Sequence, residues 1–473
     1  MINIESWNWC HENEDMLDFD VSNWPSPVKG RSFTLRLESM IHGGMEGKIR
    51  SRKRNIIRLK KAQGRQDIVN MSIHYSCCID ILQLEAIVCL VKHDVRDWES
   101  FAMTGINETG NFYSPRAFSE ELQFLFQALR HIRILKLQSS PLNRGHGLEL
   151  LLEKIPSLTR LEELRLEGWQ IDRISSSTLI KSLHCHTEKS IRILSLRSCR
   201  FLGENSFYVF CRGLKNASQL KALGVSYCNL DDNDIIPLIG SIKTHPGIEC
   251  VNLEKNCCRT QSSVDAIAKW ISEGDCKLRA LNVGALWTEF SQEGLLQRVV
   301  DPTPLFFALS HNSSLCDFNV SENYLENEEI RHLTESLVSR HKSSNLCSLD
   351  VGVNPFDENG ASSLLQLVRD LETVKNIKFE NAYMNYKCAQ LIKIQAEVNY
   401  FDAFIGKSLD FPLSLWPDVF DRIQQGTNVR KPKQRSKLST DHIYRLLRAR
   451  TGSYGKQLSL RIAMNNTKSE HWA

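Results

Sequence analysis

The sequence lacks the features that would place the protein in a membrane or on a secretory route. No apolar run approaches the roughly 18 residues that a membrane span requires, and the nearest candidate, 79–91, is interrupted by Asp80 and Glu85. The first twenty residues have neither a basic start nor an apolar stretch, so they do not resemble a secretory signal. We therefore expect a cytoplasmic protein, with the nucleus as the alternative, and no association with a membrane.

Cysteine is present, but not in a pattern that builds sites. The 15 cysteines are odd in number and include no C-x-x-C pair. Zinc sites commonly use such pairs and disulfide frameworks need an even number, so both are disfavoured. Cysteines scattered along a long chain favour reduced thiols, as in the cytosol.

Sequence motifs for catalysis are also missing. The chain contains no H-E-x-x-H, G-x-S-x-G or G-x-G-x-x-G pattern. The one metal-like cluster, His184-Cys185-His186, offers adjacent ligands at a predicted helix end and is not expected to bind a metal. The acidic run 231–234 fits a helix N-terminus better than a calcium loop, because Ile235 occupies a ligand position. We predict no enzyme, no cofactor and no metal site.

What the sequence does contain is a repeat with the frame L-x-x-L-x-L-x-x-(N/C)-x-L. Ten segments fit this frame, and they begin at Trp98, Ile132, Leu161, Ile191, Leu220, Ile248, Leu278, Leu315, Leu346 and Val374. Successive starts are 34, 29, 30, 29, 28, 30, 37, 31 and 28 residues apart, and the first and last copies are degenerate. A register kept over ten copies predicts a stacked array of repeats that share one core.

Each copy predicts a strand, a turn and a helix. The L-x-L core alternates with period two, so its apolar side chains share one buried face, as Leu164 and Leu166 do. A small residue at the N/C position turns the chain out of the strand with its polar atoms. That position holds Cys199, Cys228, Asn256, Asn323 and Asn354. Trp169 and Leu286 depart from the pattern and predict local irregularity. Between the strands, apolar residues recur at helical spacing.

The period of about 28–30 residues and the helical outer half resemble the ribonuclease-inhibitor class of leucine-rich repeats. The resemblance covers about residues 95–395. It implies an α/β fold: a curved solenoid with parallel strands on the concave face, helices on the convex face and helical caps. It implies little about function, because one fold hosts many functions.

We expect four segments along the chain. Their bounds are 1–70 for a partly disordered N-terminal arm, 71–398 for the solenoid with its N-terminal cap, 399–425 for a C-terminal cap and 426–473 for a basic helical tail. The N-terminal cap is predicted in the helical run 79–92. Sequences in the last two segments, FPLSLWPDVFDRI and IYRLLR, are similar to the C-terminal element of algal leucine-rich-repeat proteins of unknown function.

Charge is distributed unevenly over these segments. The net charge is +3 over residues 1–70, −6 over 71–399 and +7 over 400–473. Within the arm, residues 46–66 hold nine Lys or Arg side chains. This basic segment is either a solvated arm or a nuclear-import or anion-binding signal. An acidic body with basic ends is unlike a uniformly basic nucleic-acid binder.

The strand alternation also predicts which side chains leave the concave face. We expect Lys136, Arg165 and Arg197 to form an early basic column, and Asp317 and Asp350 to make the later half acidic. The partner-binding side chains expected on this face are Lys136, Gln138, Arg165, Glu167, Arg197, Ser226, Asn252, Glu254, Asn282, Asp317, Asn319 and Asp350. A partner of opposite charge polarity would be steered to such a face. The alternative for any one position is a solvated side chain without a ligand.

The 37-residue unit adds a second candidate surface. Its extra segment, 287–300, reads WTEFSQEGLLQRVV and places Trp287 and Phe290 in a predicted loop. Insertions in repeat proteins often map to a binding face. The alternative is that both aromatic side chains pack on the edge of the array.

These features predict a non-catalytic scaffold or regulator that binds a protein partner, of unknown identity, on its concave face. One alternative resembles the GTPase-activating protein for Ran, in which case Arg144 and Arg173, in strand-to-helix loops, would contact a small GTPase. A second alternative is nucleic-acid association through the basic ends. The concave face lacks the basic stripe with interleaved aromatics that nucleic-acid binding favours.

Overall fold

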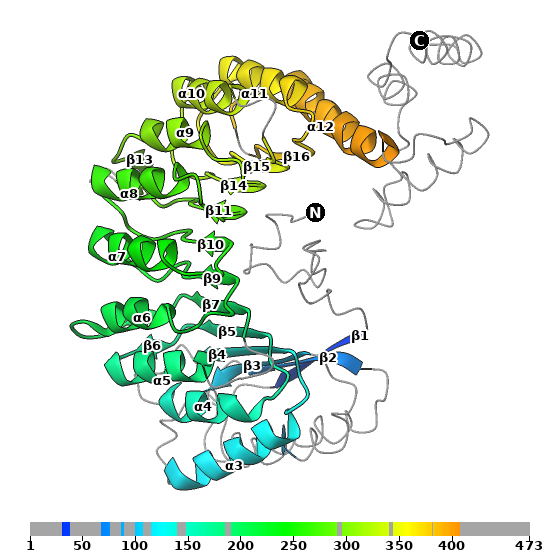
Figure 1. The fold of residues 1–473 in the computed structure, drawn as a ribbon. Coiled ribbons are helices and arrows are strands. Elements are labelled where there is room, and N and C mark those ends of the chain that lie inside the picture. The colour runs from blue at the N-terminus through cyan, green and yellow to red at the C-terminus, as the bar shows by residue number, and fades with distance from the viewer. Residues whose placement is uncertain are drawn as a thin grey trace, which may run out of the picture.

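The structure is a computed structural model, and it describes residues 31–37, 68–75, 87–88, 100–106, 115–139, 148–184, 191–290, 296–339, 344–380 and 382–406. Within them the chain is a curved α/β leucine-rich-repeat solenoid. Strands line the inner side of the curve and helices cover its outer side (Figure 1). The predicted fold class is confirmed.

The inner layer is a single parallel sheet. In the described residues it has twelve strands, which follow one another in chain order: β1 (Arg31–Leu37), β2 (Ile68–Tyr75), β3 (Ser100–Ile106), β4 (Ile134–Ser139), β5 (Glu163–Glu167), β7 (Ile193–Arg197), β9 (Ala222–Gly224), β10 (Cys250–Asn252), β11 (Ala280–Asn282), β14 (Asp317–Asn319), β15 (Ser348–Asp350) and β16 (Asn376–Lys378). Equivalent frame positions pair with each other, so Leu164 lies beside Leu194 and Leu166 beside Leu196. Each side-chain type therefore forms a column across the repeats.

The outer layer consists of helices that connect these strands. They are α3 (Pro115–Ala128), α4 (Leu148–Lys154) with the 3-10 turn Ile155–Ser157, α5 (Arg173–His184), α6 (Ser206–Leu214), α7 (Asp232–Lys243), α8 (Gln261–Ile271), α9 (Thr303–Leu309), α10 (Asn327–Val338), α11 (Glu358–Asp370) and α12 (Tyr386–Gly406). The predicted acidic N-terminus is confirmed at α7, where Asp231 and Asp234 form a capping box. Capping and the favourable charge explain why the helix begins there.

The core lies between the two layers and runs through the whole array. Leu164, Leu166, Leu194 and Leu196 are fully buried in it, as the alternation predicts. Each buried large aliphatic side chain contributes roughly 1.5–3 kcal/mol before conformational entropy is subtracted. Because neighbouring repeats bury one another's leucines, no single repeat is stable alone.

A ladder of side-chain hydrogen bonds holds the turns that follow the strands. The Cys228 thiol donates to the carbonyl oxygen of Leu196 at 2.7 Å, which belongs to the preceding repeat. The Asn256 and Asn323 amides donate to the equivalent carbonyls of the repeats before them, at 2.9 and 2.8 Å. Trp169 keeps the ladder intact, because its indole nitrogen donates to Leu137. The irregularity predicted at Trp169 is therefore wrong.

The sheet begins earlier in the chain than predicted. The strands β1 and β2 pair with each other in parallel and continue through β3 into the array. Their apolar residues alternate, so that Phe33 lies beside Met71, and Met71 beside Phe101. The sheet therefore extends across the predicted boundary at residue 71, and sequence reasoning missed these strands because they carry the two-residue period without the full leucine frame. Of the predicted N-terminal cap, 79–92, only residues 87–88 are described, and they are helical. The basic segment 46–66 lies outside the described residues.

The boundary predicted at residue 399 falls inside a continuous helix, α12. The buried Asn399 side chain donates to the carbonyl oxygens of Val368 at 2.8 Å and Val374 at 2.9 Å, at the end of α11. This helix therefore closes the last repeat with residues on both sides of the predicted boundary. The remainder of the predicted cap and the basic tail lie outside the described residues.

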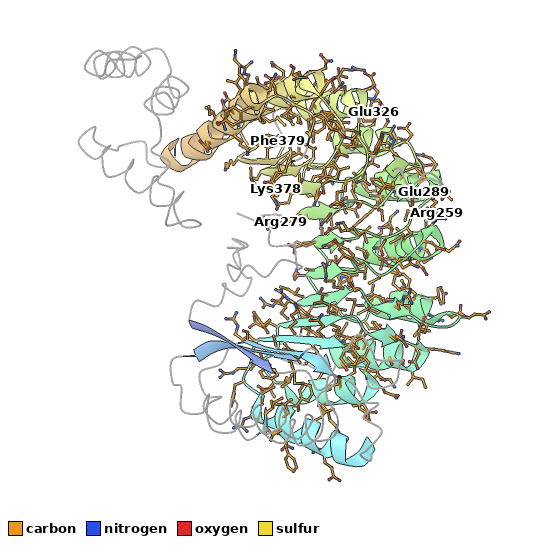
Figure 2. The ribbon with its side chains drawn as sticks, turned by 180° about the vertical axis from the view of Figure 1, so that it is seen from behind. Arg259, Arg279, Glu289, Glu326, Lys378 and Phe379 are labelled. Carbon is orange, nitrogen blue, oxygen red and sulfur yellow. The ribbon has the colours of Figure 1, made fainter. Side chains whose placement is uncertain are left out.

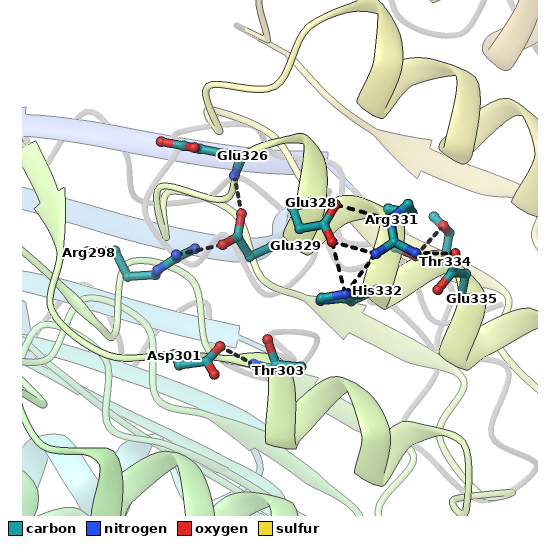
Figure 3. A network of polar contacts seen from close by, with 10 residues as sticks. All are labelled: Arg298, Asp301, Thr303, Glu326, Glu328, Glu329, Arg331, His332, Thr334 and Glu335. Carbon is teal, nitrogen blue, oxygen red and sulfur yellow. Dashed lines mark hydrogen bonds and ion pairs between the residues drawn. The ribbon is translucent and has the colours of Figure 1, made fainter.

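The long repeat contains an antiparallel hairpin where we expected a loop. Its strands are β12 (Thr288–Phe290) and β13 (Leu296–Arg298), while the shorter pair β6 (Gln170–Ile171) and β8 (Arg200–Phe201) is parallel. The Arg298 guanidinium reaches Glu329 of α10 at 2.6 Å, beside a second ion-pair cluster around Arg331 (Figure 3). Burial alone would raise the pKa of Glu329, but hydrogen bonding and charge from Arg298 outweigh it and lower that pKa. The hairpin is thus fixed to the next repeat.

Candidate interaction surface on the concave face

The structure brings the predicted side chains into columns on the inner face of the sheet. The central column, in pairing order, is Lys136, Arg165, Ser195, Gly224, Asn252, Asn282, Asn319, Asp350 and Lys378. The inner and outer sides of the curve are separated in Figure 2, where Arg279 and Lys378 lie on the inner side and Arg259 with Glu289 on the outer side. The predicted geometry of the face is therefore present, but its electrostatics differ from the prediction.

The early basic column is partly compensated by glutamates on the same face. Lys136 Nζ lies 3.2 Å from Glu167 Oε2, and Arg197 Nε lies 3.7 Å from Glu167 Oε1. Arg165 forms an ion pair with Glu163 one column away. The three cations share two carboxylates, so the positive charge expected at this end is reduced and not free, because the leucine frame places acidic side chains beside it.

The pairs at this end continue into a longer chain of contacts. The Arg197 guanidinium lies 4.2 Å from the centre of the Tyr227 ring, and Lys255 Nζ lies 5.2 Å from the same ring. Lys255 then meets Glu322 at 3.1 Å. Cations over an aromatic face are attracted by the ring quadrupole. We name the resulting series the polar chain; its members are Lys136, Glu167, Arg197, Tyr227, Lys255 and Glu322.

Sequence reasoning missed half of the polar chain. Tyr227, Lys255 and Glu322 occupy the position just before the N/C residue, which we had assigned to the turn rather than to the face. At this position the backbone is left-handed, with φ of 59° at Tyr227, 54° at Lys255 and 55° at Glu322. That conformation rotates the side chain back over the inner edge. Because all three residues precede the N/C residue by one position, their regular spacing could have indicated a further column of side chains.

The polar chain is partly open to solvent. The exposed fraction of its charged side chains ranges from 14% at Arg197 to 34% at Glu322. Burial would lower the pKa of Lys255, but its contacts with Tyr227 and Glu322 outweigh this and raise that pKa. The lysine is therefore firmly cationic within a mixed-charge surface.

Further along the array, most predicted binding residues serve the backbone instead. Asn252, Asn282, Asn319 and Asp350 each accept, through Oδ1, the backbone N–H two residues ahead, at 2.8–2.9 Å. This local bond competes with the sheet ladder, and it coincides with strands of only three residues. All four side chains are buried, as is that of Ser226, whereas Gln138 is half-buried. These asparagines and Asp350 therefore shape the face.

The acidic half of the face is also modified by its surroundings. Lys378 Nζ lies 3.7 Å from Asp350 Oδ2. Asn282 donates to Glu254 at 3.2 Å, and burial raises the pKa of that carboxyl. Within the described residues, neither oxygen of the buried Asp317 has a hydrogen-bond partner of good geometry, and burial raises its pKa to about 8 although the neighbouring Ser348 hydroxyl and the Arg279 charge act to lower it. Asp317 is thus the least compensated carboxylate of the face.

The second candidate surface is reduced by the hairpin. Trp287 is fully buried, which supports the packing alternative for this residue and removes it from any partner-binding surface. Phe290 ends strand β12, and its side chain lies outside what the structure describes.

The chemistry of the described residues gives no support to a catalytic centre. Among them, no group of three or more His, Cys, Asp or Glu side chains is placed to hold a metal ion. Burial raises the pKa of the Cys199 and Cys211 thiols to about 12, so neither supplies a thiolate nucleophile. His184 contacts the backbone oxygen of Asn216 at 3.0 Å, and the rest of the His-Cys-His cluster lies outside the described parts. None of the described helices has the length and hydropathy of a membrane span.

Comparisons with known proteins find similar solved structures but no family model and no curated relative. An internalin (inlF) from Listeria monocytogenes is 14% identical with a TM-score of 0.32, and the match covers 67% of this chain and 87% of the internalin. TLR13, solved with ssRNA13, is 13% identical with a TM-score of 0.34, and the match covers 71% of this chain and 38% of TLR13. A chain of the yeast Rad7 and Elc1 complex is 14% identical with a TM-score of 0.41, and the match covers 70% of this chain and 81% of that chain. The chain thus spans well under half of TLR13. These neighbours are leucine-rich-repeat proteins, and with TM-scores below 0.5 no conclusion about this chain rests on them.

Proposed function

We propose that the protein is a non-catalytic scaffold that binds a protein partner through the polar chain of its concave face. The observation that carries the proposal is the continuity of this series, which links side chains from β4 to the turn after β14 while leaving each charged member partly exposed. Its positions are fixed by the sheet register and the left-handed turns, so little side-chain freedom is lost when a partner binds.

The polar chain favours a partner surface that carries charges of both signs. It contains three cations and two anions, in the order Lys136, Glu167, Arg197, Lys255 and Glu322, so a purely acidic or purely basic surface would meet like charges at some of its contacts. Tyr227, held between two cations, supplies the amphipathic aromatic surface that is enriched at protein interfaces. This replaces the opposite-polarity partner that the sequence predicted.

Charge reversal tests the proposal directly. Partners would be captured from native cells with the wild-type chain, identified by mass spectrometry and then assayed as purified proteins against Arg197→Glu and Lys255→Glu. We expect each reversal to weaken binding by about 2 kcal/mol or more, because it places like charges together in a half-buried setting. The matched control is Lys269→Glu on the outer helix α8, which is exposed. A partner that binds all variants equally well refutes the concave-face assignment.

The two other functions have less support. For the GTPase-activating alternative, Arg173 is exposed at the first residue of α5, and Arg144 lies outside the described residues. A GTP-hydrolysis assay with the purified chain tests it. For nucleic-acid association, the two basic ends also fall largely outside the described parts, and a steep salt dependence of RNA or DNA binding would support it. We retain the cytoplasm as the proposed location, with the nucleus as alternative.

A further inference from the structure

A groove on the convex side of the array, between helices α5 and α6, has a composition that the concave face lacks. Its volume is about 750 Å³, and its walls include Arg173 and Lys181 from α5, Tyr208 and Arg212 from α6, and Lys215 just beyond α6. The groove is distinct from the polar chain, since the helices lie on the opposite side of the sheet (Figure 1).

The groove floor is narrow because two helices approach closely. A Cβ atom added to Gly213 of α6 would lie 2.7 Å from both γ carbons of Ile180 on α5. Only a glycine allows this approach. The buried Ile180 and the half-buried Val209 therefore form an apolar floor beneath the polar rim.

The rim carries charges of one sign. Arg173, Lys181, Arg212 and Lys215 are all exposed, and no acidic side chain lines this groove. In the part of the chain that the structure describes, none of the four forms an ion pair, unlike Lys136 or Arg197 on the concave face. Four unneutralised cations around one hollow create a positive potential that attracts an anionic group.

Two neighbouring hollows on the same side of the array provide a comparison. The hollow next to it is lined by both Arg200 and Asp234, and the following one is lined by Arg259, Asp231 and Asp232. Both of these hollows carry charges of both signs, whereas the α5–α6 groove is lined by cations alone.

An exposed aromatic side chain adds an apolar contact. Tyr208 is 55% exposed, and Ile174 at the start of α5 is 57% exposed. Large apolar side chains exposed beside a charged rim are typical of protein-binding surfaces. Nucleic acid fits less well, because non-specific binding to single strands uses several stacked aromatic side chains, whereas Tyr208 is the single aromatic residue in the lining of this groove.

We propose that the α5–α6 groove binds an acidic peptide segment of a protein partner. Glutamate or aspartate carboxylates of the segment meet Arg212, Lys181 and their neighbours, and an apolar side chain packs on Tyr208. Arginine suits this role because its guanidinium binds a carboxylate through two parallel hydrogen bonds. The proposal does not depend on the polar chain, and each surface can be tested while the other is intact.

The test uses the full chain and a fluorescent synthetic peptide of alternating glutamate and leucine, with a glutamine-for-glutamate peptide as its uncharged counterpart. We expect binding of the acidic peptide to weaken by about tenfold or more in the double variant Lys181→Glu/Arg212→Glu, as two reversed contacts imply. The matched control, Lys269→Glu/Arg369→Glu, reverses two exposed lysine or arginine residues on α8 and α11, and its affinity should stay within about twofold.

Three results overturn the proposal. The first is equal binding of both peptides, and the second is an equal loss in the groove variant and the control. The third is preferential binding of a single-stranded oligonucleotide of the same charge that is lost in the groove variant, which would assign the groove to nucleic acid. Tyr208→Ala gives an independent measurement. The substitution should lower the affinity for the acidic peptide without changing the salt dependence of that affinity, because no charge is removed.

Discussion

The indole nitrogen of Trp169 donates a 2.9 Å hydrogen bond to the carbonyl oxygen of Leu137, one repeat earlier in the array. In the following repeats, Cys199 and Cys228 make the same contact to the equivalent carbonyls of Leu166 and Leu196. The Trp169 indole, the cysteine thiols and the asparagine amides at this frame position therefore all donate to a backbone carbonyl of the preceding repeat. In these repeats the position holds a buried donor of varying size, whereas Leu286, at the same position of the long repeat, is buried without a side-chain donor.

This equivalence predicts the response to substitution at Trp169. Trp169→Phe keeps most of the buried ring but leaves the Leu137 carbonyl without its donor, at a cost of about 1–3 kcal/mol in the free energy of unfolding. Trp169→Ala also opens a cavity and should cost about 3–5 kcal/mol. Urea denaturation followed by circular dichroism measures both. Tyr383→Ala, at a residue 75% exposed, is the matched aromatic control and should change little. A Phe variant as stable as wild type would mean that the hydrogen bond contributes nothing.

The fold was predictable because the leucine frame encodes both periods that the solenoid needs. The pairing of Leu164 with Leu194 follows directly from the spacing of the repeats. The frame did not show which departures from its residue types the solenoid accommodates. Trp169 looked like a defect because the sequence shows residue type and not the donor atom, and β1 was overlooked because two-residue alternation without the full frame is a weak signal.

Asn256 gives the sharpest test of the turn ladder. Its amide accepts from the backbone N–H groups of Cys228 and Leu230, both at 3.1 Å, and donates to the carbonyls of Val225 at 2.9 Å and Leu253 at 2.8 Å. Asn256→Leu matches the amide in size but leaves four backbone groups unsatisfied, so we expect a loss of about 3 kcal/mol or more in unfolding free energy.

Asn256→Cys should cost less than the leucine variant, since a thiol at the same position donates well at Cys228. The ranking wild type, Cys, Leu is the expected outcome in urea denaturation. Asn216→Leu, at an exposed position, controls for the loss of an amide alone. If the Leu and Cys variants were equally stable, the donor would not be what matters at this position.

The concave site was predictable in geometry and not in electrostatics. Strand alternation correctly placed Lys136 and Arg165 on one face, because side-chain direction is fixed by the backbone. Whether those charges are free depends on what the neighbouring repeats place beside them. Glu167, itself on the predicted surface, partly compensates Lys136 and Arg197. Tyr227 lies on this face because its backbone is in the left-handed region, a conformation that the sequence frame does not reveal for a non-glycine residue.

Asp317 makes stability depend on pH. Burial raises the pKa of this carboxyl from 3.8 to about 8, so between these values the folded chain binds a proton that the unfolded chain has lost. Stability therefore falls as pH rises through this window, by up to roughly 1.4 kcal/mol per pH unit from this group, and levels off above pH 8.

Asp317→Asn removes that ionisation. We expect the variant to match wild type near pH 4 and to be clearly more stable near pH 9, as measured by urea denaturation across the range. Asp265→Asn on α8, at an exposed position, is the matched control and should leave the pH profile unchanged. A wild-type profile that stays the same after Asp317→Asn would show that this carboxyl does not ionise differently in the two states.

Two helical glycines should respond in opposite directions to the same substitution. In an exposed helix interior, alanine is more favourable than glycine by roughly 0.5–1 kcal/mol, because glycine loses more backbone entropy on folding. Gly240 in α7 has open space at its Cβ position, so Gly240→Ala should stabilise the chain by about that amount. Gly213→Ala would place its methyl group 2.7 Å from two carbons of Ile180, and we expect a net loss of about 1–3 kcal/mol from overpacking.

The cause of that loss can be isolated with a double variant. Ile180→Ala removes both γ carbons that the new methyl group would meet, so Gly213→Ala should cost less on the Ile180→Ala background than on the wild type. Urea denaturation of the four chains measures this coupling. If Gly213→Ala stabilised the wild-type chain as Gly240→Ala does, then α5 and α6 would not be held at the separation described.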